Sequence, residues 1–221
     1  MSADLSHVDT WLFDLDNTLY PIETQFMGLI EAKMTDFVAR ETGLPRDEAR
    51  ALQHGYFKEH GTTLAGLMAN HGIEPQRFLD EVHDVSLDCL SPDPALRAAI
   101  AALPGRRLIF TNGSVGHAER VLAHLNLRDL FSELFAIETA DYVPKPALAT
   151  FDRICKLHDI DPPMTAFFED SEKNLVPASR LGMTTVLVGP HAAASTSEHV
   201  HFRTNDLAEF LSSARLQGSP A

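Results

Sequence analysis

The chain has 221 residues, of which 44% are apolar, and this suits one globular domain with an insertion. Its 18 basic and 31 acidic side chains give a net charge of -13, which argues against a broad surface for a nucleic acid polymer or an anionic membrane. No stretch approaches the length of a membrane span, and no signal peptide is expected. Cys89 and Cys155 form no CxxC motif, which favours reduced, packed thiols in a cytoplasmic protein.

The first strand is expected to end in two aspartates. Residues 8–13 form a short apolar run typical of a buried strand, and Asp14 and Asp16 follow it directly. Side chains two positions apart in an extended chain point the same way, so both carboxylates are expected to converge where open α/β sheets bind ligands. A hard cation such as Mg²⁺ would offset their repulsion. Turn or capping aspartates are the alternative.

Residues 21–90 have the apolar spacing of helices rather than strands. Four helices are expected, over 26–42, 45–60, 62–71 and 75–82, with Thr62 or Thr63 as the cap of the third. Tyr20-Pro21 on one side and residues 91–94 on the other fit a hinge. The expected organisation is a helical cap of residues 21–90 inserted into a core of residues 1–20 and 91–221.

From Asp93 onward, helices and strands alternate as in a parallel sheet with crossover helices, which predicts an α/β fold. Strands are expected at 107–111, 134–137, 166–168 and 184–188, and helices at 94–103, 115–125, 146–157, 175–181 and 206–214. The loop 189–204 carries little information, and the residues after Arg215 are expected to fray.

Polar groups follow the later strands at the same edge of the predicted sheet. Residues 111–114 (Thr-Asn-Gly-Ser) present a hydroxyl, an amide and a helix start that suits an anion. Lys145 is held between two prolines in a preset direction. Glu169 and Asp170 follow a third apolar strand. Taken singly, these features also fit a turn, a surface lysine and helix capping, but together they indicate one site.

The order Asp14-Leu15-Asp16-Asn17-Thr18, Thr111, Lys145, Glu169-Asp170 resembles the haloacid dehalogenase-like (HAD) hydrolase superfamily over nearly the whole chain. The resemblance implies a phosphatase with a Rossmann-like core, in which Asp14 is the nucleophile and Asp16 the general acid and base. It implies Mg²⁺ bound by the Asp14 carboxylate, the Asp16 main-chain carbonyl and the Asp170 carboxylate, with Glu169 and Asn174 supporting these ligands. It also implies that Thr111, Lys145 and the Asn112 amide hold the phosphoryl oxygens.

Within the superfamily, Asp16 and Asp170 argue against dehalogenation, because the dehalogenases lack an acid two residues after the nucleophile and use no magnesium. Residues 14–21, 61–67 and 83–84 are similar to the pyrimidine 5'-nucleotidase branch, which implies a nucleoside monophosphate such as UMP or CMP as substrate. His60 stands where that branch would have a tyrosine. Sugar phosphates and phosphoglycolate therefore stay open as substrates.

Three further questions stay open at this point. A mutase would share the aspartyl-phosphate step, and a non-catalytic phospho-ligand-binding protein would share the fold. The chain is expected to be a monomer or a homodimer.

His199 and His201 are interpreted as solvated loop residues rather than metal ligands, and the remaining histidines as surface or core residues without a function.

Overall fold

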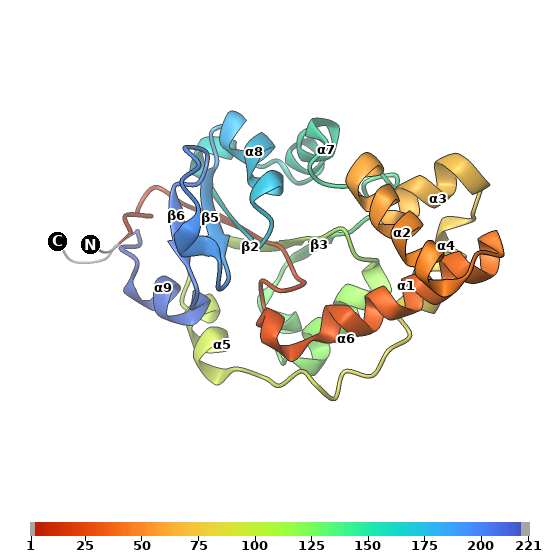
Figure 1. Cartoon of the computed structure of the whole chain (residues 1–221). Coiled ribbons are helices and arrows are strands. Elements are labelled where there is room, and N and C mark those ends of the chain that lie inside the picture. The colour runs from red at the N-terminus through yellow and green to blue at the C-terminus, as the bar shows by residue number, and fades with distance from the viewer. Residues whose placement is uncertain (1–2, 218–221) are drawn as a thin grey trace.

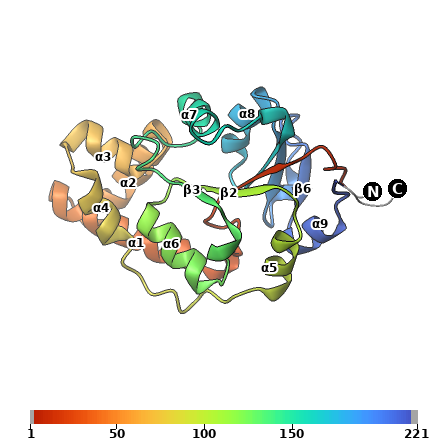
Figure 2. The same ribbon diagram turned by 180° about the vertical axis from the view of Figure 1, so that it is seen from behind.

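The computed structural model describes residues 3–217, which contain a parallel sheet between two layers of helices (Figures 1 and 2). The strands within this range are β1 Thr10–Phe13, β2 Arg106–Phe110, β3 Glu133–Phe135, β4 Thr165–Glu169, β5 Thr184–Val188 and β6 Phe202–Thr204. Their order in the sheet is β3-β2-β1-β4-β5-β6, and each neighbouring pair is parallel. Phe13 pairs with Ile109 on one side and Phe168 on the other, so β1, β2 and β4 end at one edge.

Alternate strand residues face opposite helix layers, because side chains alternate across a strand. The helices of the core are α5 Pro94–Ala101, α6 Val115–His124, α7 Leu148–His158, α8 Glu172–Arg180 and α9 Leu207–Ser213. Trp11 and Phe13 pack in the cluster that includes α5, α6 and α9 residues. Leu12 packs in the other cluster, with α7 and α8 residues. The two views show these two sets of helices on opposite faces of the sheet. Burial on both faces explains why the strands read as continuous apolar runs.

Four α-helices lie between β1 and α5 in the chain: α1 Phe26–Thr42, α2 Arg46–His60, α3 Thr63–His71 and α4 Pro75–Val82. They pack against one another to one side of the sheet (Figure 1, right). Their bounds agree with the sequence prediction within one residue. Thr62 caps α3, since its hydroxyl accepts a hydrogen bond from the Ala65 N–H. We call α1–α4 the four-helix group.

The structure differs from the prediction at several element boundaries. The loop predicted over 189–204 ends in β6, a short edge strand of three half-buried residues, which is too short to show an alternating pattern. β3 begins at Glu133, one residue early, α7 begins at Leu148, two residues late, and α8 begins at Glu172, three residues early. Boundaries are set by local hydrogen bonds at the caps, which apolar periodicity does not report.

The ends of the described range pair with each other. The Arg215 N–H donates to the Ala3 carbonyl, and Leu216 packs against the core, so the expected fraying does not begin directly after Arg215. The rest of that expectation, from residue 218, lies outside the described residues. Cys155 is half-buried and free, but Cys89 is exposed, so the predicted packing role is wrong for Cys89. Within residues 3–217, no helix combines the length and apolarity that crossing a membrane requires.

Candidate active site

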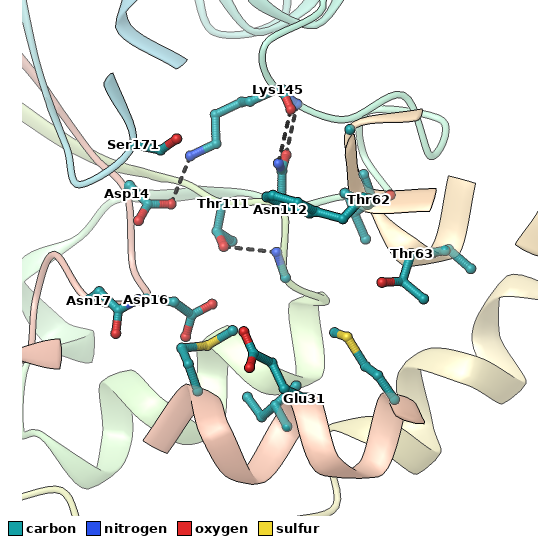
Figure 3. Close-up of a pocket in the computed structure, with 18 of the residues that line it drawn as sticks. Asp14, Asp16, Asn17, Glu31, Thr62, Thr63, Thr111, Asn112, Lys145 and Ser171 are labelled. Carbon is teal, nitrogen blue, oxygen red and sulfur yellow. Dashed lines mark hydrogen bonds and ion pairs between the residues drawn. The ribbon is translucent and has the colours of Figure 1, made fainter. Parts of the chain in front are cut away.

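A cavity of about 530 Å³ lies between the loops at the carboxyl edge of the sheet and the four-helix group. Every site residue predicted from the sequence lines it: Asp14, Asp16, Thr111, Asn112, Lys145, Glu169, Asp170 and Asn174. In Figure 3, Asp14, Thr111 and Lys145 lie on the core side, and Glu31, Thr62 and Thr63 come from the four-helix group. The structure therefore brings the predicted residues together at one place.

Lys145 is a buried cation and not a surface lysine. Its side chain is 1% exposed, and Nζ donates to Asp14 Oδ1, Glu169 Oε2 and the Phe110 carbonyl, each at 2.7 Å. Burial opposes the charge, but the carboxylates of Asp14 and Glu169 outweigh it and raise the pKa of Lys145 above its usual range. Its positive charge is therefore fixed next to Asp14.

Asp14, Glu169 and Asp170 form a carboxylate cluster whose closest oxygens lie within 4.8 Å of one another. Burial, followed by repulsion from Glu169, raises the pKa of Asp14 to about 7. Burial likewise raises the pKa of Glu169 to about 7 and that of Asp170 to about 6. Lys145 offsets one of the three negative charges. Because these are hard oxygen donors with uncompensated charge, the cluster fits a divalent cation such as Mg²⁺.

Asp16 lines the same cavity as Asp14, but its carboxylate is not part of this cluster. The extended chain ends at Phe13, and the turn that follows has Asn17 at a φ of 61°, so the alternation of a strand no longer applies. Asp16 Oδ1 instead accepts hydrogen bonds from the Tyr20 hydroxyl at 2.7 Å and from His117 Nε2 at 2.8 Å. Burial favours the neutral acid, but these partners outweigh it and lower the pKa of Asp16.

Sequence reasoning assigned no role at the site to His83, His117 or Tyr20, although Tyr20 and His83 lie in the segments that resemble the nucleotidase branch. The His83 and His117 rings stack at 4.3 Å between centroids, and His83 Nδ1 lies 2.9 Å from Ser114 Oγ. Burial lowers the pKa of His83 to about 3, which keeps it neutral. A signal was available: His117 lies in the first turn of the helix that follows β2, and Tyr20 lies four residues after Asp16.

Asn112 has a structural role besides the phosphate-binding one expected from the sequence. Its Oδ1 accepts from the Lys145 N–H at 2.8 Å, and its Nδ2 donates to the Lys145 carbonyl at 3.2 Å (Figure 3). Both ends of the amide thus hold the backbone of Lys145, and the second N–H of Nδ2 stays available to a phosphoryl oxygen. Thr111 Oγ1 accepts from the Gly113 N–H at 2.9 Å, so its own proton stays available to a ligand.

Two more predicted features can be placed. Asn174 is 6% exposed, and its Oδ1 has no hydrogen-bond partner in the described part of the chain. His201 is not simply solvated, because its Nδ1 accepts a hydrogen bond from the Thr185 N–H at 3.0 Å. Neither His199 nor His201 belongs to a group that could hold a metal among the residues described.

Comparisons with known proteins agree with this geometry. A family model described as haloacid dehalogenase-like hydrolase matches residues 8–182, so the chain belongs to this family of hydrolases. Phosphate metabolism protein 8 of Saccharomyces cerevisiae is 29% identical over 193 residues, which cover 80% of this chain and 60% of the yeast protein. The match thus spans less than two thirds of the length of that relative.

Solved structures show the same fold. A HAD phosphatase from Thermococcus onnurineus has a TM-score of 0.61 at 18% identity, with 97% of this chain and 100% of the other covered. A 2-haloacid dehalogenase from Pseudomonas syringae pv. Tomato has a TM-score of 0.59 at 18% identity, with 93% and 98% covered. At these identities the likeness extends to the fold alone, and both phosphatases and dehalogenases share it.

Proposed function

We propose that this HAD-family hydrolase is a Mg²⁺-dependent phosphomonoesterase with nucleoside 5'-monophosphates as substrates, in which Asp14 is the nucleophile. The observation that carries the proposal is the buried carboxylate cluster of Asp14, Glu169 and Asp170 joined to Lys145 at the wall of one cavity. In this proposal, residues 21–90 act as the cap over a core of residues 1–20 and 91–221. The free thiols fit a cytoplasmic location.

The reaction proceeds in two displacements. Asp16 is a carboxylate in the free protein, because its pKa is lowered, so it takes up a proton before the first step. An Asp14 oxygen attacks the phosphorus, the bond from phosphorus to the ester oxygen breaks, and Asp16 gives this proton to the leaving oxygen. The Asp16 carboxylate then takes a proton from water, whose oxygen attacks the aspartyl phosphate and releases inorganic phosphate and free Asp14. The positive charge of Lys145 offsets negative charge on the phosphoryl oxygens during both steps, and the Thr111 hydroxyl donates a hydrogen bond to one of them.

Mg²⁺ would be held by the Asp14 and Asp170 carboxylates and the Asp16 carbonyl, and when bound it supplies positive charge to the phosphoryl group. Glu169 touches Lys145 directly and therefore positions the lysine. Two features favour a phosphatase over a dehalogenase: the cation-fitting cluster, and an acid at Asp16 that is held next to the site by Tyr20 and His117. A phospho-ligand-binding protein would need no acid at Asp16.

The proposal is tested by phosphate release from UMP, CMP, sugar phosphates and phosphoglycolate, with magnesium or with EDTA. We expect UMP or CMP to be turned over best, and both EDTA and Asp14→Asn to abolish release. Preference for a sugar phosphate would keep the mechanism and overturn the substrate assignment. Release that survives Asp14→Asn would overturn the nucleophile, and no magnesium-dependent release from any substrate would favour phospho-ligand binding instead.

A further inference from the structure

Glu31 brings a free carboxylate to the side of the cavity opposite the phosphoryl site. It lies on α1 and lines the cavity with Met27 and Met34, which are four residues before it and three after it, on the same face of the helix. Figure 3 shows its side chain pointing from α1 toward the loops of the core that carry Asp16 and Thr111. Glu31 is thus placed where the leaving group of a bound phosphomonoester would lie.

The Glu31 carboxylate has no hydrogen bond or ion pair with any described residue, although its main-chain carbonyl accepts from Thr35 Oγ1. The neighbouring Met27 and Met34 supply no charge. Lys173 also lines the cavity, but it makes no ion pair with Glu31, and its Nζ lies 3.9 Å from the centre of the Phe57 ring. In the free protein, the Glu31 carboxylate is therefore satisfied by water.

A leaving group that enters this space displaces that water and must replace its hydrogen bonds. Hydroxyl and N–H groups can do so, because they donate to a carboxylate. A leaving group with its own carboxylate cannot, and it adds repulsion between like charges next to Glu31, whose side chain is exposed at the cavity wall. An unpaired acid at this position therefore discriminates between leaving groups by charge.

We propose that Glu31 is a specificity-determining residue that selects phosphomonoesters with an uncharged, hydroxyl- or N–H-bearing leaving group and rejects those with a carboxylate. The inference rests on the proposed phosphomonoesterase activity and names the class of substrate for that same site. Nucleosides and uncharged sugars fall within the selected class, whereas phosphoglycolate falls outside it.

Glycerol 3-phosphate and 3-phosphoglycerate test the proposal as a matched pair, because they differ only in a hydroxymethyl group against a carboxylate. We expect the wild-type kcat/KM to favour glycerol 3-phosphate by about tenfold or more. Glu31→Gln keeps the size of the side chain and removes its charge, so the ratio should fall toward one, chiefly through a gain on 3-phosphoglycerate. Glu48→Gln, at an exposed acid of α2 away from the cavity wall, should leave the ratio unchanged.

p-Nitrophenyl phosphate, which carries neither a carboxylate nor a hydroxyl, reports the phosphatase activity separately. Hydrolysis of this ester with the same substrate ratio in wild type and Glu31→Gln overturns the role of Glu31 alone. A wild-type preference for 3-phosphoglycerate does the same. Absence of magnesium-dependent hydrolysis of all three esters overturns the proposed function, and the inference with it.

Discussion

Asp16 shows how a single side chain can be prepared for proton transfer. Tyr20 and His117 both hydrogen-bond to its Oδ1, and Oδ2 makes no hydrogen bond to the described residues. Asp16 Oδ2 lies next to Gly113 at the cavity wall, since a Cβ added to this glycine would be 3.5 Å from the oxygen. One oxygen therefore fixes the orientation of the carboxyl group while the other is left for the proton that is exchanged with substrate and water.

If this orientation matters, removing either donor should slow turnover without weakening substrate binding. Tyr20→Phe and His117→Phe each keep a ring and lose a hydrogen bond to a charged group, and we expect kcat to fall by about tenfold to a hundredfold while KM stays within about twofold. Steady-state kinetics on UMP measures both constants.

Tyr56→Phe is the matched control, because it removes a tyrosine hydroxyl that bonds to His71 within the four-helix group. It should leave kcat unchanged. Equal effects of Tyr20→Phe and Tyr56→Phe would count against a positioning role for Tyr20.

At the scale of elements, the four-helix group depends on one close approach between α2 and α3. A Cβ on Gly66 would lie 2.3 Å from Tyr56 Cγ, so only glycine lets the two helices pack at this distance. By contrast, a Cβ on Gly55 in α2 would meet no atom within 4 Å. Both glycines lie inside a helix, but only Gly55 has room for a Cβ atom.

Gly66→Ala should therefore destabilise the protein by about 1–3 kcal/mol through overpacking. Gly55→Ala should stabilise it by about 0.5–1 kcal/mol, since alanine loses less conformational freedom in a helix. Urea unfolding followed by circular dichroism measures both free energies. A stability gain from Gly66→Ala would show that α3 is not packed against Tyr56 as described.

Sequence reasoning predicted elements well where periodicity and caps agree. In α1, the apolar stripe ends at Gly43, whose φ of 71° suits glycine, and both signals are visible in the sequence. β6 was missed because three half-buried edge residues carry no periodic signal.

The site was predicted as a set of residues but not as a geometry. The parallel direction of the strands brings Asp14, Thr111 and Asp170 to one edge, and this direction follows from the alternation of helices and strands. The orientation of Asp16 and the partners of Asn112 depend on turns after the strands, where hydrogen bonds to distant residues decide the conformation. Such contacts leave no periodic trace in the sequence.

At the scale of the whole molecule, the chain carries a net charge of -13 and concentrates buried carboxylates at one edge of its sheet. The pKa values of Asp14 and Glu169 rise to about 7 and that of Asp170 to about 6, chiefly through burial. A carboxyl whose pKa is raised on folding stabilises the protein below its unfolded pKa, near 4. This stabilisation is lost as the pH rises through the folded pKa.

The effect of magnesium on thermal stability should consequently depend on pH. Protons and the cation compete for the same carboxylates, so Mg²⁺ should raise Tm more at about pH 8 than at about pH 5. Titration of groups outside the cluster, such as His83, changes Tm equally with and without Mg²⁺. The difference between the two Tm values therefore reports on the cluster alone. Differential scanning fluorimetry measures this difference, and a larger shift at the lower pH would contradict a carboxylate site for the cation.

The central claim, that Asp14 receives the phosphoryl group, is tested most directly by trapping it. In Asp16→Asn, p-nitrophenyl phosphate can still react, because its leaving group needs no proton, whereas the water step lacks its base. We expect a burst of about one p-nitrophenolate per enzyme and, after acid quench and digestion, one phosphoryl group on the peptide that contains Asp14. Asp14→Asn combined with Asp16→Asn should lose both signals. Phosphate release by the wild-type protein, with no burst and no phosphoryl group on that peptide in Asp16→Asn, would contradict the account.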